Sequence, residues 1–120
     1  AFQRRGLVRD IVISEHLEGD LIKFYGVEGI NFFDWDYASN LCSKFGLELY
    51  NGKAQGFQFS ADTLKRLADT VANILDIPIY GGDCIVSASS DIRIIDFNDW
   101  PSFARCRDAA AHAIAQRILK

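Results

Sequence analysis

Two β-branched runs on either side of a polar pentapeptide constrain the fold more than any other part of the chain. Residues 81–86 (GGDCIV) precede the polar residues 87–91 (SASSD), and residues 92–103 (IRIIDFNDWPSF) follow them. Short polar turns between such runs are typical of β-hairpins. Centring the turn on Ser89 and Ser90 predicts three cross-strand pairs: Asp83 with Asp96, Ile85 with Ile94, and Ser87 with Ile92.

The predicted hairpin carries oxygen-bearing side chains on one face. Asp83 lies opposite Asp96, and Asn98 shares that face because side chains alternate along a strand. Mg²⁺ prefers carboxylate and amide oxygens and completes its shell with water or phosphate. Two facing carboxylates also repel each other unless a cation lies between them. The alternative is that these acidic residues only cap loops, because Asp-x-Asn by itself is a weak motif.

The second strand of the hairpin is strongly apolar. The side chains of Ile92, Ile94, Ile95 and Phe97 point to both faces of the sheet, which predicts a strand covered on both sides. A carboxylate at the end of such a strand is costly unless it is paired or bound to a metal. This expectation favours the metal site.

Composition limits the class of protein. The chain has 120 residues, 49% of them apolar, which predicts one small domain with a packed core. The net charge of -3 and the lack of a Lys/Arg block disfavour nucleic acid as a partner. No apolar run of about 18 residues or signal-peptide pattern indicates a membrane or export. Cys42, Cys84 and Cys106 lack zinc spacing, so we expect three free thiols in a reducing cytoplasm.

The rest of the chain predicts an α+β fold, an antiparallel sheet with helices packed on it. Strands are expected over residues 7–17, 20–27 and 30–35, joined by short turns into a meander. Residues 36–59 are irregular, with a short helix around 39–45. Ser60 caps a helix that continues to residue 75, and Pro101 begins a last helix that ends near residue 119. The order is therefore β-β-β, irregular, α, β-β, α.

These motifs resemble the C-terminal part of an ATP-grasp domain. The resemblance is carried by residues 81–83 (GGD), by residues 96–98 (DFN) and by Pro101 soon after them. Residues 12–23 (VISEHLEGDLIK) are similar to the hinge strand, turn and returning strand of that family. The two pieces occur in the family's order, about 70 residues apart. The resemblance covers most of the chain except residues 36–59.

The resemblance implies roles for individual residues. Asp83, Asp96 and Asn98 would bind one or two Mg²⁺ ions that bridge the phosphates of ATP, with Asp96 as the bridging ligand. Lys23 matches a basic position that contacts the transferred phosphate or the substrate. The backbone of Glu15, His16 and Leu17 would lie beside adenine, Asp20 would reach the ribose, and Ser102 at the start of the last helix would help to bind an anion.

The family contains two kinds of reaction. In its ligases a substrate carboxylate attacks the γ-phosphate, and an amine or a thiol then displaces phosphate from the acyl phosphate. In its inositol phosphate kinases a hydroxyl is phosphorylated directly. The resemblance implies a carboxylate–amine or carboxylate–thiol ligase first, while Asp-Phe-Asn followed by Trp-Pro-Ser-Phe is somewhat closer to the kinases.

A complete ATP-grasp enzyme also has N-terminal lobes, with phosphate-binding lysines and a glycine-rich loop, that this chain lacks. We therefore expect residues 1–120 to be a partial domain of a longer protein, which binds Mg-nucleotide but is inactive without those lobes and a small-molecule acceptor. The alternative is a non-catalytic module with the same fold. The aromatic residues 32–35 (FFDW), if exposed, would favour that alternative.

Overall fold

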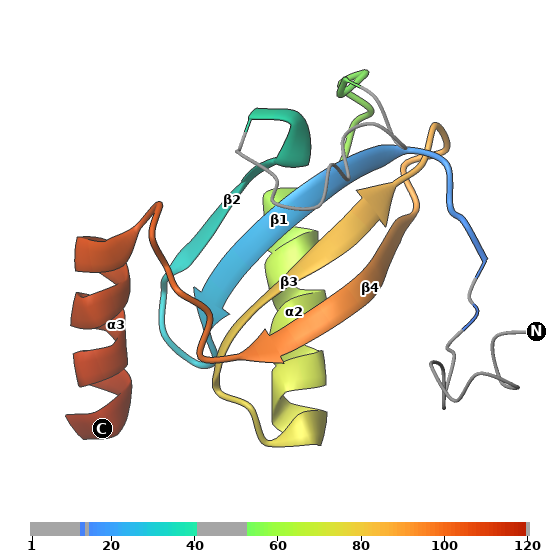
Figure 1. Ribbon diagram of the computed structural model, residues 1–120. Helices are drawn as coiled ribbons and strands as arrows, with labels where there is room; N and C mark the ends of the chain where they lie inside the picture. Colours follow the sequence, from blue (N-terminus) through green and yellow to red (C-terminus); the bar gives the residue numbers. More distant parts are fainter. Residues whose placement is uncertain (1–12, 14, 41–52, 120) are drawn as a thin grey trace, which may run out of the picture.

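A four-stranded antiparallel sheet organises the computed structural model, which describes residues 13, 15–40 and 53–119 (Figure 1). The strands lie side by side in the order β2-β1-β3-β4. Two α-helices accompany them, so the α+β class is confirmed. The elements in chain order are β1 (Asp20–Val27), β2 (Phe33–Tyr37), the 3-10 turn η2 (Ala38–Asn40), α2 (Ala61–Leu75), β3 (Ile79–Val86), β4 (Ile92–Asp99) and α3 (Arg107–Leu119).

Helix α2 covers one face of the sheet, which we call the covered face (Figure 1). Ser60 caps the helix as expected, because its Oγ accepts a hydrogen bond from the backbone N–H of Thr63 at 3.3 Å. Asp76 ends it in the left-handed conformation, with φ of 57°. The core beneath the helix is formed by Ile22, Phe24, Leu64, Ala68, Ala72, Tyr80, Cys84 and Val86.

The opposite face is apolar at both ends and polar in the middle, and we call it the polar face. At one end Val27 and Ile79 pack with Phe103 and with two alanines of α3. At the other end Leu21 and Ile85 pack with Ala38 and Leu17. Between these clusters the strands carry charged and amide side chains. The folding of the chain therefore leaves a polar strip across the centre of this face.

A β-bulge at Ile95 separates two registers in the β3–β4 hairpin. Asp83 pairs with Asp96 as predicted, but Ile85 pairs with Arg93 and Val86 pairs with Ile92. The predicted pairs of Ile85 with Ile94 and of Ser87 with Ile92 are therefore wrong. The loop is centred on Ser89 alone, because Ser90 takes a φ of 68° and closes a shorter turn. The extra residue Ile95 then restores the predicted register at the site.

Strand β4 lies at the edge of the sheet, and the expectation that it is covered on both sides is wrong. Ile95 is 52% exposed, and Asp96 and Asn98 are exposed as well. The isoleucines project to both faces because the bulge interrupts their alternation. Burial of β4 therefore gives no support to the metal site.

The last helix begins at Arg107, so the expectation that Pro101 starts it is wrong. Trp100 and Phe103 have φ values of 46° and 52°, which no right-handed helix contains. Phe103 is 5% exposed, and its ring packs against that of Tyr25 at an interplanar angle of 51°, with centroids 5.9 Å apart. Burial of this side chain holds residues 100–106 in a non-helical loop. The free N–H groups of a helix are thus not next to Ser102.

Other expectations are settled in part. Residues 1–12 and 14 of the strand expected over 7–17 lie outside the described residues, and residues 13 and 15–17 form no strand. The strand expected over 30–35 is found at 33–37, and of the helix around 39–45 only the turn at 38–40 is described. Cys84 and Cys106 are free thiols, and Cys42 lies outside the described residues. No helix in the described part of the chain is long and apolar enough to cross a membrane.

Candidate functional site

Four charged residues form a straight row across the polar face, one from each strand. Asp36 on β2 pairs with Lys23 on β1, Lys23 pairs with Asp83 on β3, and Asp83 pairs with Asp96 on β4. Paired residues of antiparallel strands share a face, so the four side chains lie next to one another. We call this set the polar row. The structure thus brings Lys23 next to Asp83, which is 60 residues away in the chain, and places both beside Asp96.

Two direct contacts hold side chains of the polar row, one within the row and one with the neighbouring Asn98. The Nζ atom of Lys23 lies 3.1 Å from Oδ1 of Asp83, and both side chains are largely buried. Asn98 donates a hydrogen bond from Nδ2 to Oδ2 of Asp96 at 2.9 Å, on the exposed edge strand. Because the amide nitrogen of Asn98 faces Asp96, its Oδ1 is left as an acceptor beside the two carboxylates.

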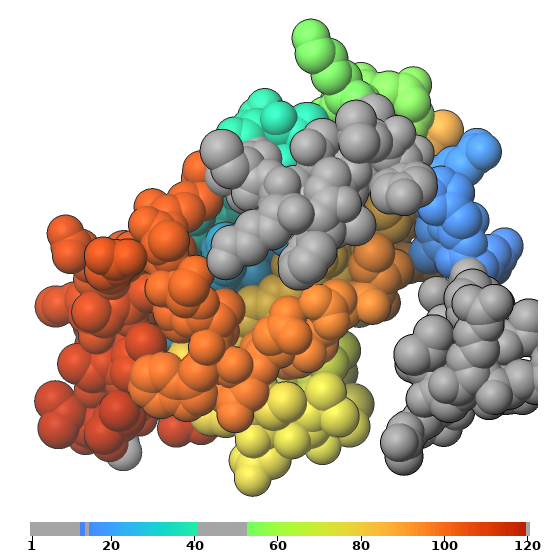
Figure 2. Space-filling view, viewed as in Figure 1, coloured from blue at the N-terminus to red at the C-terminus, as the bar shows by residue number. Residues whose placement is uncertain are grey.

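A shallow pocket of about 150 Å³ lies over this part of the polar row. Its walls include Lys23, Asp83, Asp96 and Asn98, together with Ser102 from the loop after β4. That loop and β4 lie at the surface in the space-filling view, where they are drawn in orange (Figure 2). Ser102 therefore does line the site, although it does so from a loop and not from the start of a helix.

Tyr25 and two glycines give the pocket its shape. Tyr25 lines the wall, and burial raises the pKa of its phenol, so it is a neutral hydrogen-bond donor near pH 7. A Cβ atom on Gly81 would lie 2.8 Å from Cγ of Pro101, and one on Gly82 would lie 2.2 Å from the carbonyl oxygen of Asp96. Both contacts are shorter than real Cβ atoms make, so the close approach of the loop and of β4 to β3 requires glycine here.

The oxygen atoms that line the pocket suit a hard cation only if a bound molecule supplies further oxygen ligands. The described residues contain no group of three or more His, Cys, Asp or Glu side chains placed to hold a metal. Asp83, Asp96 and Asn98 offer two carboxylates and one amide, and Asp83 is already paired with Lys23. Mg²⁺ commonly binds through one or two carboxylates plus water and phosphate oxygens. This arrangement is therefore compatible with a metal–phosphate complex and not with a cage built from protein alone.

Asp20 lies apart from the pocket and holds the backbone. It is 2% exposed, and its two oxygens accept hydrogen bonds from the backbone N–H groups of Gln55 at 2.6 Å and Phe57 at 2.8 Å. Each carboxylate oxygen thus accepts from one backbone donor of the segment before α2. The structure gives Asp20 an anchoring role, and its contact with ribose stays a prediction.

The expected adenine-binding residues lie at the other end of the hairpin. Glu15 and Leu17 line a second hollow of about 250 Å³, together with Arg93 and Asp91 near the hairpin loop. His16 is exposed and does not line this hollow. The two hollows are on different parts of the polar face: along β3 the first is lined by Asp83 and the second by Ile85.

Arg105 makes a contact with the polar face that sequence reasoning missed. It contacts Asp34 and Asp36 on β2, which are 71 and 69 residues away in the chain. No local pattern around Arg105 points to those partners. The alternation of Asp34 and Asp36 with aromatic residues on a strand was the one available signal, because it places both carboxylates on the same face as Lys23.

The aromatic residues 32–35 are not an exposed patch. Phe33 and Trp35 pack against the core beneath α2, and Phe32 packs against the cluster around Phe103. The ring of Trp35 lies 4.8 Å from that of Phe59, edge to face. These partly buried side chains therefore stabilise the sheet.

We compared the chain with models of known protein families, with curated proteins and with solved structures, and none of the three comparisons gave a match.

Proposed function

We propose that the polar face binds the phosphates of a Mg-nucleotide, as the C-terminal lobe of an ATP-grasp enzyme would. The observation that carries the proposal is the pairing of Asp83 with Asp96, with Asn98 beside them and the ammonium of Lys23 at 3.1 Å from Asp83. Two carboxylates and an amide are suited to Mg²⁺, and the ammonium is suited to a phosphate oxygen. The sequence resemblance to the ATP-grasp family supports the same assignment.

The balance of charge around the polar row also supports a cationic ligand. Asp36, Asp83 and Asp96 of the row and the neighbouring Asp34 carry four negative charges, against the two positive charges of Lys23 and Arg105. Arg93 lies further along this face, at the second hollow. Like charges in register are unfavourable unless a cation compensates them. Bound Mg²⁺ would supply that compensation and would neutralise charge on the phosphates of the nucleotide.

The protein residues would act mainly by positioning. In the proposed site Asp83, Asp96 and Asn98 hold the metal, Lys23 binds a phosphate oxygen, and neutral Tyr25 donates a hydrogen bond from the pocket wall. Phosphoryl transfer needs this alignment and charge neutralisation more than covalent chemistry from the protein. In a complete enzyme the acceptor and the remaining phosphate contacts would come with the other lobes.

The acceptor distinguishes a ligase from a kinase. A carboxylate acceptor would form an acyl phosphate, which an amine or a thiol then attacks, whereas a hydroxyl acceptor would keep the phosphoryl group. We place the ligase first, as the resemblance implies, with the inositol phosphate kinase-like reaction second. The non-catalytic module stays as the third candidate, and the packing of the aromatic residues 32–35 against the two clusters weakens one of the observations that favoured it.

A calorimetric titration of the chain with Mg-ATP tests the proposal. We expect Asp96→Ala and Asn98→Ala to weaken binding by roughly 10- to 100-fold, which corresponds to the loss of one interaction with a charged group. Asp99→Ala is the matched control, since Asp99 is an exposed acidic residue of the same hairpin that lines neither hollow. Equal binding, or equal absence of binding, by wild type and both pocket variants would contradict the proposal.

A further inference from the structure

Arg105 connects the loop between β4 and α3 to the edge strand β2. Its Nε donates to Oδ2 of Asp34 at 2.7 Å, and its Nη1 donates to Oδ2 of Asp36 at 2.8 Å. The two carboxylates are two residues apart on one strand, so they lie on the same face. A guanidinium group can hold both at once because its donors form a planar fork, which a lysine ammonium lacks.

The contact with Asp36 reaches the polar row directly. Both oxygens of Asp36 are occupied: Oδ1 accepts from the backbone N–H of Tyr37 at 2.7 Å and from Nδ2 of Asn40 at 2.9 Å, and Oδ2 accepts from Arg105. Asp36 is also the residue directly opposite Lys23. An aspartate in that position is the ordinary partner of a cross-strand lysine.

Lys23 therefore lies between two carboxylates, Asp36 on β2 and Asp83 on β3. Its ammonium is paired with Asp83, at 3.1 Å. The charge of Asp36 is already compensated by Arg105, so the ammonium of Lys23 gains more from Asp83. Without Arg105, Asp36 would present an uncompensated carboxylate oxygen on the other side of the lysine.

We propose that Arg105 is a positioning residue for Lys23. By holding Asp36 it directs the Lys23 ammonium toward Asp83, and thus into the pocket that Asp96 and Asn98 also line. The consequence for nucleotide binding rests on the proposed function, whereas the partner that Lys23 takes does not. Loss of Arg105 transfers Lys23 to Asp36 and leaves Asp83 facing Asp96 without an ammonium.

Anchoring the loop is the competing role for Arg105, because Pro101 and Ser102 of the same loop line the pocket. Two variants separate the roles. Arg105→Ala removes the anchor and frees Asp36. Addition of Asp36→Asn to that variant removes the charge that competes for Lys23, but it does not restore the anchor.

Nucleotide-free crystal structures of the variants give the first readout. An ion pair requires the nitrogen and oxygen atoms to lie within about 4 Å of each other. In Arg105→Ala we expect the Lys23 Nζ atom to form an ion pair with Asp36 and no longer with Asp83. In the double variant we expect the pair with Asp83 to return. The proposal is overturned if Lys23 remains paired with Asp83 in Arg105→Ala. It is also overturned if the Lys23–Asp83 pair does not return in the double variant.

Titration with Mg-ATP gives the second readout. We expect Arg105→Ala to weaken binding by about tenfold, because one charge-assisted contact to phosphate is lost, and the double variant to recover most of it. A double variant that remains as weak as Arg105→Ala supports loop anchoring and overturns the inference. If no form of the chain binds Mg-ATP, the proposed function fails, and the crystal structures still decide the role of Arg105.

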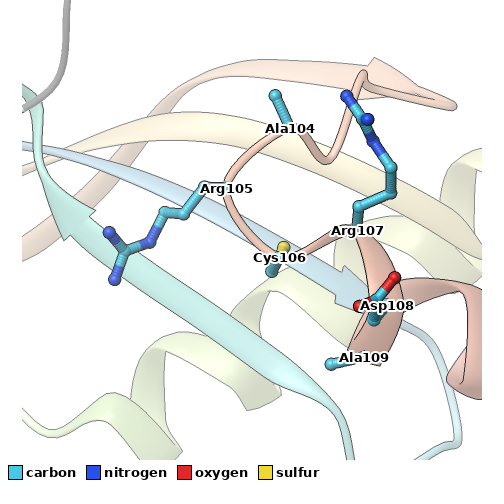
Figure 3. A pocket seen from close by; sticks show the side chains of 6 residues that line it. All are labelled: Ala104, Arg105, Cys106, Arg107, Asp108 and Ala109. Carbon is cyan, nitrogen blue, oxygen red and sulfur yellow. The ribbon is translucent and has the colours of Figure 1, made fainter.

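Arg107→Ala is the matched control. Arg105 and Arg107 lie in the same loop-to-helix segment, around a hollow of about 420 Å³, and their side chains diverge, with that of Arg105 extending toward β2 (Figure 3). Both substitutions remove one positive charge, but only Arg105 contacts β2. We expect Arg107→Ala to keep the Lys23–Asp83 pair and the affinity of wild type. A melting curve for each variant checks that the chain remains folded.

Discussion

The two faces of the sheet are built from the same strands, yet one face forms the core beneath α2 and the other carries the pocket. On the covered face Phe24 and Tyr80 are fully buried beneath α2, while on the polar face the adjacent residues Lys23 and Gly81 line a pocket. Alternation of side chains along each strand separates the two sets. The comparison teaches that stability and the proposed ligand binding can be changed independently here, by substituting the even-numbered residues of β1 and β3 or the odd-numbered residues at the centre of these strands.

The largest expected effect comes from substituting neighbours on β1. Phe24→Ala removes a buried ring that lies 5.9 to 6.2 Å, centroid to centroid, from Phe33, Tyr80 and Phe97, so we expect a loss of about 3–5 kcal/mol in the free energy of unfolding. Lys23→Ala removes a partly exposed ion pair and should cost only about 1 kcal/mol. Urea denaturation measures both, and equal losses would break the comparison between the faces.

A smaller effect is expected at the link between β3 and α2. Tyr80 donates a hydrogen bond from its hydroxyl to Oδ1 of Asp69 at 2.7 Å. Tyr80→Phe leaves the ring and removes this bond to a charged group, so we expect a loss of about 1–3 kcal/mol near pH 7. Chemical denaturation measures the loss, and Tyr25→Phe on the polar face, whose hydroxyl lines the pocket, is the control expected to change stability less.

The same substitution should change the response to alkaline pH. Burial raises the pKa of Tyr80 above its ordinary value of 10.0 and raises the pKa of Cys84 to about 12, from 9.0. As the pH rises, the unfolded chain therefore loses these two protons before the folded chain does. The contribution of the two groups to stability is constant below about pH 9 and falls as the pH rises further. We expect Tyr80→Phe to fall less steeply above pH 10. A parallel decline in both proteins would contradict this assignment.

The smallest effect has the opposite sign. Asp96→Asn removes the repulsion between Asp96 and Asp83 while keeping an oxygen that can accept the bond from Asn98. Without a cation present, we expect stability to rise by about 0.2–1 kcal/mol. Asp83→Asn is the comparison, because it breaks the ion pair with Lys23 and should not stabilise. Denaturation in the absence of Mg²⁺ measures both, and destabilisation by Asp96→Asn would show that the facing carboxylates do not repel.

Local patterns were sufficient to predict much of this fold. The strand over residues 20–27 and the helix capped by Ser60 are found in the structure, and both depend on alternation or capping, which act over a few residues. The pairing of Asp83 with Asp96 is found as well, but only because the bulge at Ile95 compensates for the shorter turn. The same reasoning assembled Asp83, Asp96 and Asn98 at one end of the hairpin, and the pocket that they line contains Lys23 and Ser102 as well.

What could not be predicted depends on distant contacts. Pro101 would begin a helix in isolation, but burial of Phe103 against Tyr25 and α3 keeps the segment irregular. The position of β4 at the edge depends on the strand order, which no segment of the sequence determines alone. Arg105 was missed for the same reason, because its partners on β2 become neighbours only when the sheet has formed.

The bulge at Ile95 also bears on self-association. An apolar edge strand with a regular row of unpaired backbone groups is a template for strand addition by another chain, and so for aggregation. Ile95 interrupts that row in the middle of β4, since it has no partner on β3. At the opposite edge β2 is only five residues long and carries two aspartates. Ile95 thus has two effects. It returns Asp96 to its position beside Asp83, and it disfavours strand addition at the longer edge of the sheet.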